Sequence, residues 1–246
     1  MSRHLYDGLA GRVRHFTRRF GAAELLLVPA RAVLSPFIIP CLAPRTFCVN
    51  GVHHACFYHR YNATWCNERC VEVPLARAFL AAVAPSAVLE IGHVLSHYAA
   101  LSHTVVDKHE HAPGVINGDV RDYRPGRTFD RIVSISTFEH IGFDDEAGAS
   151  DDGGDHAIAQ AIAATRALLA PGGVFWMSAP LGYNPALDAL IERGELGAQR
   201  ILFLRRTGSR EWEQVSWEDV RGARYMRPWP FANALCVAEF DSPLRP

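Results

Sequence analysis

The chain is predicted to be an α/β protein with a doubly wound, mostly parallel sheet, preceded by an N-terminal extension. Two observations predict this class. Short apolar, β-branched segments alternate with longer segments of helical periodicity. A glycine turn follows the first of these strands, and an acidic residue ends the second. With 246 residues, 49% of them hydrophobic and 21% charged, the chain is long enough for a sizeable core.

The first βαβ unit carries the strongest pattern. A helix is predicted over Asn67–Ala84, with Asn67 as its N-cap. A buried strand follows over Ala87–Ile91, then a turn at Gly92, a short helix, and a second strand that ends at Asp107. An acid in that position can bind a ribose, so this unit is typical of nucleotide-binding sheets.

The later elements continue the alternation. A helix over Asp155–Ala170 is predicted to end at Pro171-Gly172-Gly173, because this triplet terminates helices. A second helix is predicted over Asn184–Arg193. The remaining strands are predicted at Val115–Asn117, Asp130–Ile135, Val174–Ser178, Ile201–Arg205, Glu211–Trp217 and Ala234–Phe240.

Charge and cysteine content limit the partners. A net charge of −1 offers no basic field for a nucleic acid, so none is expected. Six cysteines without a signal peptide predict reduced thiols in a cytoplasmic protein. No Cys-x2-Cys pair is present, and the acidic loop over residues 144–155 has the composition of a solvated segment. No metal site is therefore predicted.

Residues 1–66 are predicted to form a cap or lid, and residues 67–246 the main domain. The extension is basic first, with Arg12, Arg14, His15, Arg18 and Arg19, and apolar afterwards. Glu24, Arg31 and three prolines make the apolar stretch from Leu25 to Leu42 a poor transmembrane helix. A cap over the substrate cleft or a homodimer contact is favoured over contact with a membrane surface.

Five motifs stand in order along the second part of the chain: VLEIG (88–92), VVD (105–107), NGDV (117–120), FDRIVSISTFEHIG (129–142) and LLAPGGVFWMSAP (168–180). In these motifs the chain resembles the class I S-adenosylmethionine-dependent methyltransferases from about Asn67 to Phe240. More narrowly, it resembles a bacterial and archaeal branch with a VLSHY-type first loop and the segment YNATWCNERCVE (61–72). The resemblance implies a Rossmann-like, seven-stranded sheet with an antiparallel edge strand, and S-adenosylmethionine as cofactor.

The resemblance also implies roles for residues near the cofactor. Glu90 and Gly92 would approach its methionine part, where a side chain at Gly92 would block the approach. Asp107 would accept both ribose hydroxyls. The complete implied set is Glu90, Gly92, His93, Asp107, Lys108, Asp119, Val120, Ser136 and Thr137. In it, Asp119 takes the adenine amino group, Val120 packs on the ring, and Ser136 and Thr137 lie beneath the sulfonium.

The first loop departs from the family pattern at two positions. Val94 and Ser96 stand where the second and third glycines are usual. Either the loop takes another path around the methionine, or cofactor affinity is weak or absent. In the latter case the fold would be a scaffold.

The candidate catalytic residues are Glu139 and His140, directly after the fourth strand. A hydroxyl nucleophile benefits from a base with a pKa near neutrality, which favours His140. The alternative is that this pair only organises the loop. The candidate substrate contacts are Tyr58, Tyr61, Asn62, Trp65, Arg69, Tyr183 and Asn184, because polar and aromatic side chains gather in these two segments.

These residues predict a methyltransferase acting on a small polar acceptor, with O-methylation of a sugar or hydroxylated metabolite of secondary metabolism as the first choice. Alternatives are N- or C-methylation, or a cofactor-assisted reaction without methyl transfer. A non-catalytic binding protein on the same fold is the competing class.

Overall fold

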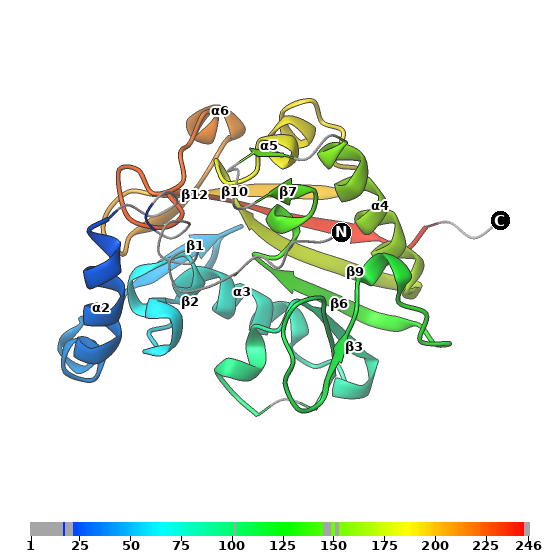
Figure 1. Ribbon diagram of the computed structural model, residues 1–246, viewed down its shortest axis with the longest axis horizontal. Helices are drawn as coiled ribbons and strands as arrows, with labels where there is room; N and C mark the ends of the chain where they lie inside the picture. Colours follow the sequence, from blue (N-terminus) through cyan, green and yellow to red (C-terminus); the bar gives the residue numbers. More distant parts are fainter. Residues whose placement is uncertain (1–16, 18–21, 101, 145–148, 151–152, 244–246) are drawn as a thin grey trace.

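The computed structural model describes residues 17, 22–100, 102–144, 149–150 and 153–243. The basic residues of segment 12–19 and the loop acids Asp145, Glu146, Asp151 and Asp152 lie outside these described residues. The described chain forms one large twisted sheet with helices against both of its faces (Figure 1).

The large sheet has eight strands in the order β11-β10-β12-β9-β6-β3-β4-β5. Their bounds are β3 (Val88–Ile91), β4 (Thr104–Asp107), β5 (Val115–Asn117), β6 (Phe129–Ile135), β9 (Leu169–Pro180), β10 (Arg200–Arg206), β11 (Trp212–Val215) and β12 (Ala234–Asp241). The strands from β5 to β9 are parallel to their neighbours, and β12 is antiparallel to both β9 and β10. The predicted α/β class is thus confirmed.

The resemblance implied seven strands, whereas the eight strands predicted one by one along the sequence all form in the sheet. The eighth strand, β11, pairs antiparallel with β10 and forms the sheet edge. The predicted antiparallel edge is therefore confirmed, and the antiparallel β12 lies between β9 and β10. The predicted seventh strand extended to Trp217, but Ser216 and Asp219 form a capping box there and start a short helix.

The helices are α2 (Glu24–Ile38), α3 (Arg69–Leu80), α4 (Gly154–Ala167), α5 (Pro185–Glu192) and α6 (Trp217–Val220). Short 3-10 segments are η1 (Ile39–Cys41), η2 (Tyr61–Cys66, kinked at Asn62 and Ala63), η3 (Pro85–Ala87), η4 (Leu95–His97), η5 (Val120–Asp122) and η6 (Phe138–His140). Two small hairpins join β1 (Thr46–Val49) to β2 (Val52–Ala55) and β7 (Phe143–Asp144) to β8 (Ala149–Ser150).

Two element boundaries differ from the prediction for local reasons. Helix α3 begins at Arg69 because the Asn67 side chain accepts the backbone N–H of Arg69, 3.0 Å away. Strand β9 begins before the Pro-Gly-Gly triplet, since Leu169 already pairs with Phe129 of β6. An irregularity in the β6–β9 register then accommodates the triplet.

Alternate residues of β6 serve the two faces of the sheet. Ile132 packs with α4 and α5 on one side, whereas Val133 and Ile135 pack with α3 on the other. The second cluster also contains Phe47 and Val49 of the first hairpin. The N-terminal part of the chain therefore shares a core with the sheet, and the boundary at residue 66 stays a prediction.

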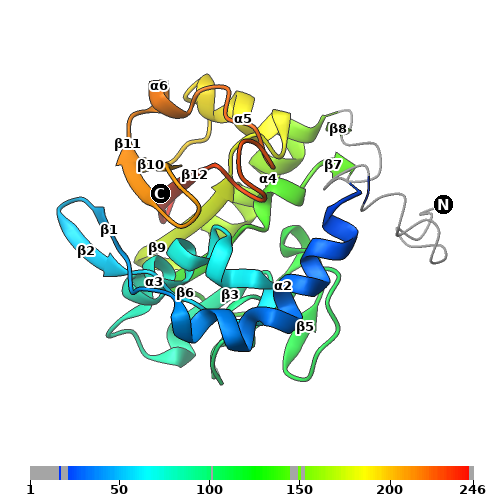
Figure 2. The ribbon, with the colours of Figure 1, turned by 90° about the vertical axis from the view of Figure 1, so that its left-hand side faces the viewer.

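Helix α2 confirms a helical N-terminal extension. It lies on the side toward which the arrows of β6 and β9 point (Figure 1), and it crosses the front of the molecule in Figure 2. Arg31 of α2 lies 5.7 Å above the ring of Phe231, in the segment that leads into β12. This places α2 beside the carboxyl ends of the parallel strands.

Candidate active site

The candidate site lies at the carboxyl ends of β3, β4 and β6. Strand β3 has β4 on one side and β6 on the other, so the chain leaves it in opposite directions along the sheet. Such a switch point opens a crevice outside the strand ends. The segments that follow or lie next to these strand ends are the loop after β3, the loop after β4, η6 and the start of α3.

Gly92 makes the turn at the end of β3. Its φ is +87°, a conformation that costs a side chain energy. A Cβ atom built there would lie 2.1 Å from Oγ1 of Thr137, at the end of β6. Thr137 thus leaves no space for a side chain at position 92.

Glu90 fixes the loop that lacks the usual glycines. Its buried carboxylate accepts the backbone N–H groups of Val94 at 2.9 Å and Leu95 at 2.7 Å. Its second oxygen lies 2.8 Å from Nε2 of His103. Glu90 thus acts as a cap for η4, and its role toward a methionine group stays a prediction.

Asp107 joins the loops after β3 and β4. Its carboxylate accepts three backbone N–H groups, from His93 at 2.9 Å, His109 at 2.8 Å and Glu110 at 2.7 Å. Burial alone raises the pKa of this carboxyl, but the three donors bring the pKa below its ordinary value. A carboxylate has about four acceptor positions. Beside these three donors Asp107 keeps about one acceptor position, and its contacts with the ribose hydroxyls stay a prediction.

Asp119 is held by cations of its own neighbourhood. Arg121 donates from two nitrogens, at 2.6 and 2.9 Å, and Lys108 Nζ lies 3.2 Å away. The Arg121 side chain is the main cause that holds the pKa of Asp119 far below its usual range. An adenine amino group would have to share this carboxylate with Arg121 and Lys108. Val120 next to it is buried, 6% exposed.

A buried network beneath the crevice was not predicted from the sequence. Glu72 of α3 is fully buried and accepts the hydroxyls of Ser136, at 2.6 Å, and Ser178, at 2.7 Å. Its other oxygen lies 2.9 Å from Arg69. Ser136 has a φ of +39°, a strained conformation that this contact helps to hold. The sequence signal that could have revealed this network is Glu72 itself, an acid at a position on the apolar face of the predicted helix.

The catalytic candidates lie on η6. His140 is 45% exposed at its side chain, and its Nδ1 lies 3.3 Å from the hydroxyl of Tyr183. Glu139 is buried, and its Oε2 has no hydrogen-bond partner among the described residues. Asn184 is fully buried: it donates to the carbonyls of Glu139 and Ile141 and caps α5. Asn184 therefore supports η6, and its role as a substrate contact stays a prediction.

Burial raises the pKa of Glu139 to about 7, from an ordinary 4.5. The folded protein thus keeps this proton between these two pH values while the unfolded chain loses it. Stability is therefore highest below pH 4.5 with respect to this group, and falls by up to about 3 kcal/mol as the pH rises through 7. We expect thermal unfolding at several pH values to show this fall in the wild type and to show it much reduced in Glu139→Gln. The exposed Glu213→Gln exchange is the control, and equal slopes for all three proteins would contradict the assignment.

The segment before α3 carries several of the predicted substrate contacts and packs against the loop after β3. Tyr61 is 41% exposed and stacks on His97, with ring centroids 4.1 Å apart. Asn62 has a φ of +49°, and its carbonyl accepts from Asn67. Burial alone lowers the pKa of Arg69, but the carboxylates of Glu72 and Glu68 hold it above its ordinary value.

Two other members of that predicted set are less accessible. The Tyr58 hydroxyl and the Trp65 ring nitrogen are buried without a hydrogen-bond partner among the described residues. Burial is the main cause that raises the pKa of Tyr58. Their ligand roles stay predictions.

The histidines of the first loop meet an acid of the second. His93 Nδ1 lies 3.1 Å and His97 Nε2 lies 3.4 Å from the carboxylate of Glu110. The ligand atoms of these three side chains all lie within 4.8 Å of one another, so the geometry could accept a metal ion. The cysteines do not join this group, and all six are free thiols.

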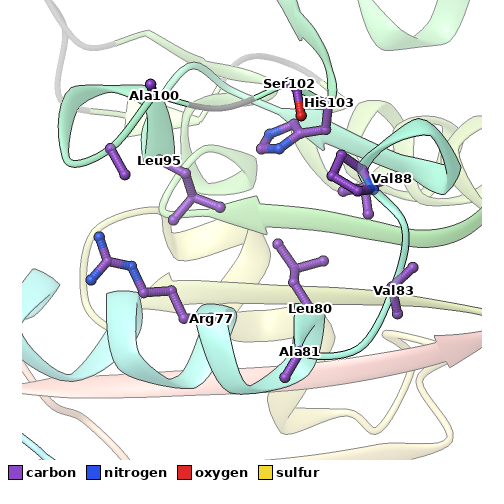
Figure 3. A pocket seen from close by; sticks show the side chains of 11 residues that line it. Arg77, Leu80, Ala81, Val83, Val88, Leu95, Ala100, Ser102 and His103 are labelled. Atoms are coloured by element: carbon purple, nitrogen blue, oxygen red, sulfur yellow. The ribbon is translucent and has the colours of Figure 1, made fainter.

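A separate cavity of about 260 Å³ lies away from the candidate site (Figure 3). It is mainly apolar and lies between the end of α3 and the β3–β4 connection. Arg77, Leu80, Val88, Leu95 and His103 are among its lining residues. None of Gly92, Asp107 and His140 lines it.

The order of the strands defines the class of fold. Apart from the additional edge strand β11, the sheet has the arrangement that the resemblance implied: a mostly parallel set with antiparallel pairing at one edge. This is the Rossmann-like fold of the class I methyltransferases.

No protein-family profile and no curated protein sequence matches the chain. Solved structures do. The chain is similar to the N-methyltransferase NodS from Bradyrhizobium japonicum WM9 in complex with S-adenosyl-L-homocysteine, with 16% identity over 72% of this chain and 87% of that chain and a TM-score of 0.44. It is also similar to a TehB-like S-adenosylmethionine-dependent methyltransferase from Corynebacterium glutamicum, with 18% identity, 68% and 86% coverage and a TM-score of 0.37. The sugar N-methyltransferase KedS8 from Streptoalloteichus sp. has 14% identity, 69% and 87% coverage and a TM-score of 0.35.

Proposed function

We propose that this chain is a methyltransferase that uses S-adenosylmethionine and acts on a small polar acceptor. The observation that carries the proposal is the position of Asp107. It ends β4 at the switch point of the sheet, beside the positive-φ turn at Gly92. A carboxylate in this place binds a ribose hydroxyl, and the turn exposes backbone to the ligand.

The residues present fit the cofactor in part. Gly92 makes a positive-φ turn without a side chain, and Asp107 keeps one acceptor position after its three backbone donors. Val120 supplies an apolar surface for a base, and Lys108 and Asp119 lie beside it. When bound, the cofactor supplies a methyl group activated by a sulfonium.

The chain's own part in the reaction is orientation and proton removal. Glu90 and Asp107 hold the two loops in a fixed geometry, because each accepts backbone N–H groups of the first loop. Thr137 and Ser136 form the floor at the end of β6. His140, placed by Tyr183 and supported through Asn184, is the group that would take the proton of an acceptor hydroxyl.

The test is calorimetric titration with S-adenosylmethionine and S-adenosylhomocysteine. We expect the wild type to bind both, and Asp107→Ala to bind at least about a hundredfold more weakly, because charge-assisted hydrogen bonds to the ribose are lost. Asp130→Ala, an exposed acid at the other end of β6, is the matched control and should bind like the wild type. Unfolding curves of each variant separate lost binding from lost fold. If the wild type binds neither compound, the proposal fails.

O-methylation of a sugar or another hydroxylated metabolite is our first choice for the reaction, since a histidine–tyrosine pair lies at the rim. Which atom of the acceptor receives the methyl group, oxygen, nitrogen or carbon, distinguishes O-methylation from N- or C-methylation. Incubation with cofactor carrying a labelled methyl group, followed by magnetic resonance of the product, identifies that atom. A carbon or nitrogen bonded to the label would replace the first choice.

One observation favours a second candidate, a binding protein on this fold without catalysis. Arg121 and Lys108 already neutralise Asp119, the residue expected to recognise adenine. An intact fold that binds neither cofactor nor its product, in the titration described above, would favour this candidate.

A further inference from the structure

Helix α2 has its polar and apolar faces reversed relative to a helix of a soluble core. Its two buried residues are Glu24 and Ser35. Its exposed positions are all uncharged and apolar: Leu26, Leu27, Pro29, Ala32, Val33, Leu34, Pro36 and Phe37. Leu26, Val33 and Phe37 are each at least 70% exposed. A surface helix normally buries the apolar stripe and exposes the charges.

The polar side chains of α2 explain how it is attached. Glu24 and Arg31 form an ion pair on the inner side, with 7% and 18% of their side chains exposed. Arg31 also lies above the ring of Phe231, and its bond to Glu24 is the main cause that raises the pKa of Arg31. The two charged residues of the helix thus bind each other on its inner side, Arg31 also contacts the folded domain, and the outward face is free of charge.

The sequence before α2 indicates what covers this face. Residues 8–23 contain Arg12, Arg14, Arg18 and Arg19 and no acidic residue. Basic residues next to an exposed apolar helix complement a surface of anionic lipids, since charge attracts the segment and the apolar side chains enter the interface. A second copy of the chain would offer only the same basic segment and the same uncharged face.

We propose that α2 docks the protein on an anionic lipid bilayer, with Leu26, Val33 and Phe37 entering the interface. The stretch Glu24–Cys41, with a mean hydropathy of 1.5, is long and apolar enough to cross a membrane by length and composition. Both charged side chains of the helix instead lie on its inner side, where Arg31 contacts Phe231 of the folded domain, so we place the helix along the bilayer surface. This proposal is independent of the methyltransferase activity.

The experiment is co-sedimentation of the full-length protein with sucrose-loaded vesicles. One set is phosphatidylcholine alone, and the other contains equal parts of phosphatidylcholine and phosphatidylglycerol. We expect binding to the anionic vesicles at low salt, release at high salt, and little binding to the neutral ones. Phe37→Glu should lower the partition coefficient by about tenfold or more, because a large apolar side chain no longer enters the lipid.

Val52→Glu is the matched control. Val52 lies on the hairpin strand β2 and is 57% exposed, so the same exchange is made on an apolar side chain outside α2. It should leave vesicle binding unchanged. The proposal is overturned if wild type stays in the supernatant with both vesicles. It is also overturned if sedimentation velocity shows a dimer that Phe37→Glu dissociates while vesicles do not bind, or if bound protein resists both high salt and alkaline extraction.

Discussion

Glu72→Ala should destabilise the protein by about 3–5 kcal/mol, the cost of breaking a buried charge pair by removing one partner. The exchange leaves the Arg69 guanidinium, only 12% exposed, without its carboxylate. It also leaves the hydroxyls of Ser136 and Ser178 without their acceptor. The midpoint of urea unfolding measures this loss. We expect cofactor binding to fall as well, because Ser136 carries its positive φ at the end of β6.

Two variants serve as controls for this result. Glu72→Gln keeps an oxygen for both serines and loses only the charge, so its loss should be smaller. Glu213→Ala breaks an exposed pair with Arg205 and should cost no more than about 1 kcal/mol. If Glu72→Ala is as stable as Glu213→Ala, the buried network does not support the fold.

Gly92→Ala should cost about 3 kcal/mol and abolish cofactor binding. Part of the cost is the positive φ, about 1–2 kcal/mol, and part is the clash of the new methyl group with Thr137, about 1–3 kcal/mol. Thermal unfolding and calorimetric titration of the variant measure the two effects.

Gly114→Ala separates these two causes. Gly114 has a φ of +84°, nearly that of Gly92, but nothing lies within 4 Å of its Cβ position. Gly114→Ala should therefore lose only the stability that the positive φ costs an alanine, and it should bind the cofactor like the wild type. The double variant Gly92→Ala/Thr137→Ala should recover some stability, since the nearest atom, Oγ1 of Thr137, is gone. Equal losses for Gly92→Ala and Gly114→Ala would contradict the role of Thr137.

The parallel strands could be predicted because their signals are local. Val88–Ile91 and residues 132–135 of β6 are mostly apolar, and burial on both faces favours such segments. The turn at Gly92 and the acid Asp107 were likewise predicted at the ends of their strands. Their place at one crevice follows from parallel pairing.

The parts that escaped prediction depend on contacts between distant segments. Glu72 meets Ser178 across more than a hundred positions of sequence, and no local pattern indicates that pairing. Asn184 was expected to face a substrate, but η6 offers it two carbonyl groups and it is buried instead. Glu24 and Arg31 argued against a transmembrane helix in the sequence, but the sequence did not show that both side chains lie on the inner side of α2.

The carboxylate of Glu90 has a consequence for finding relatives of this chain. In the usual pattern, three glycines allow the first loop to bend around its ligand. Here two backbone N–H groups bound to Glu90 give the bend, so Val94 and Ser96 can carry side chains. A search pattern that demands all three glycines would pass over such chains. The more general pattern is an acid two residues before a glycine, as in Glu90 and Gly92, followed by an acid at the end of the next strand, as in Asp107.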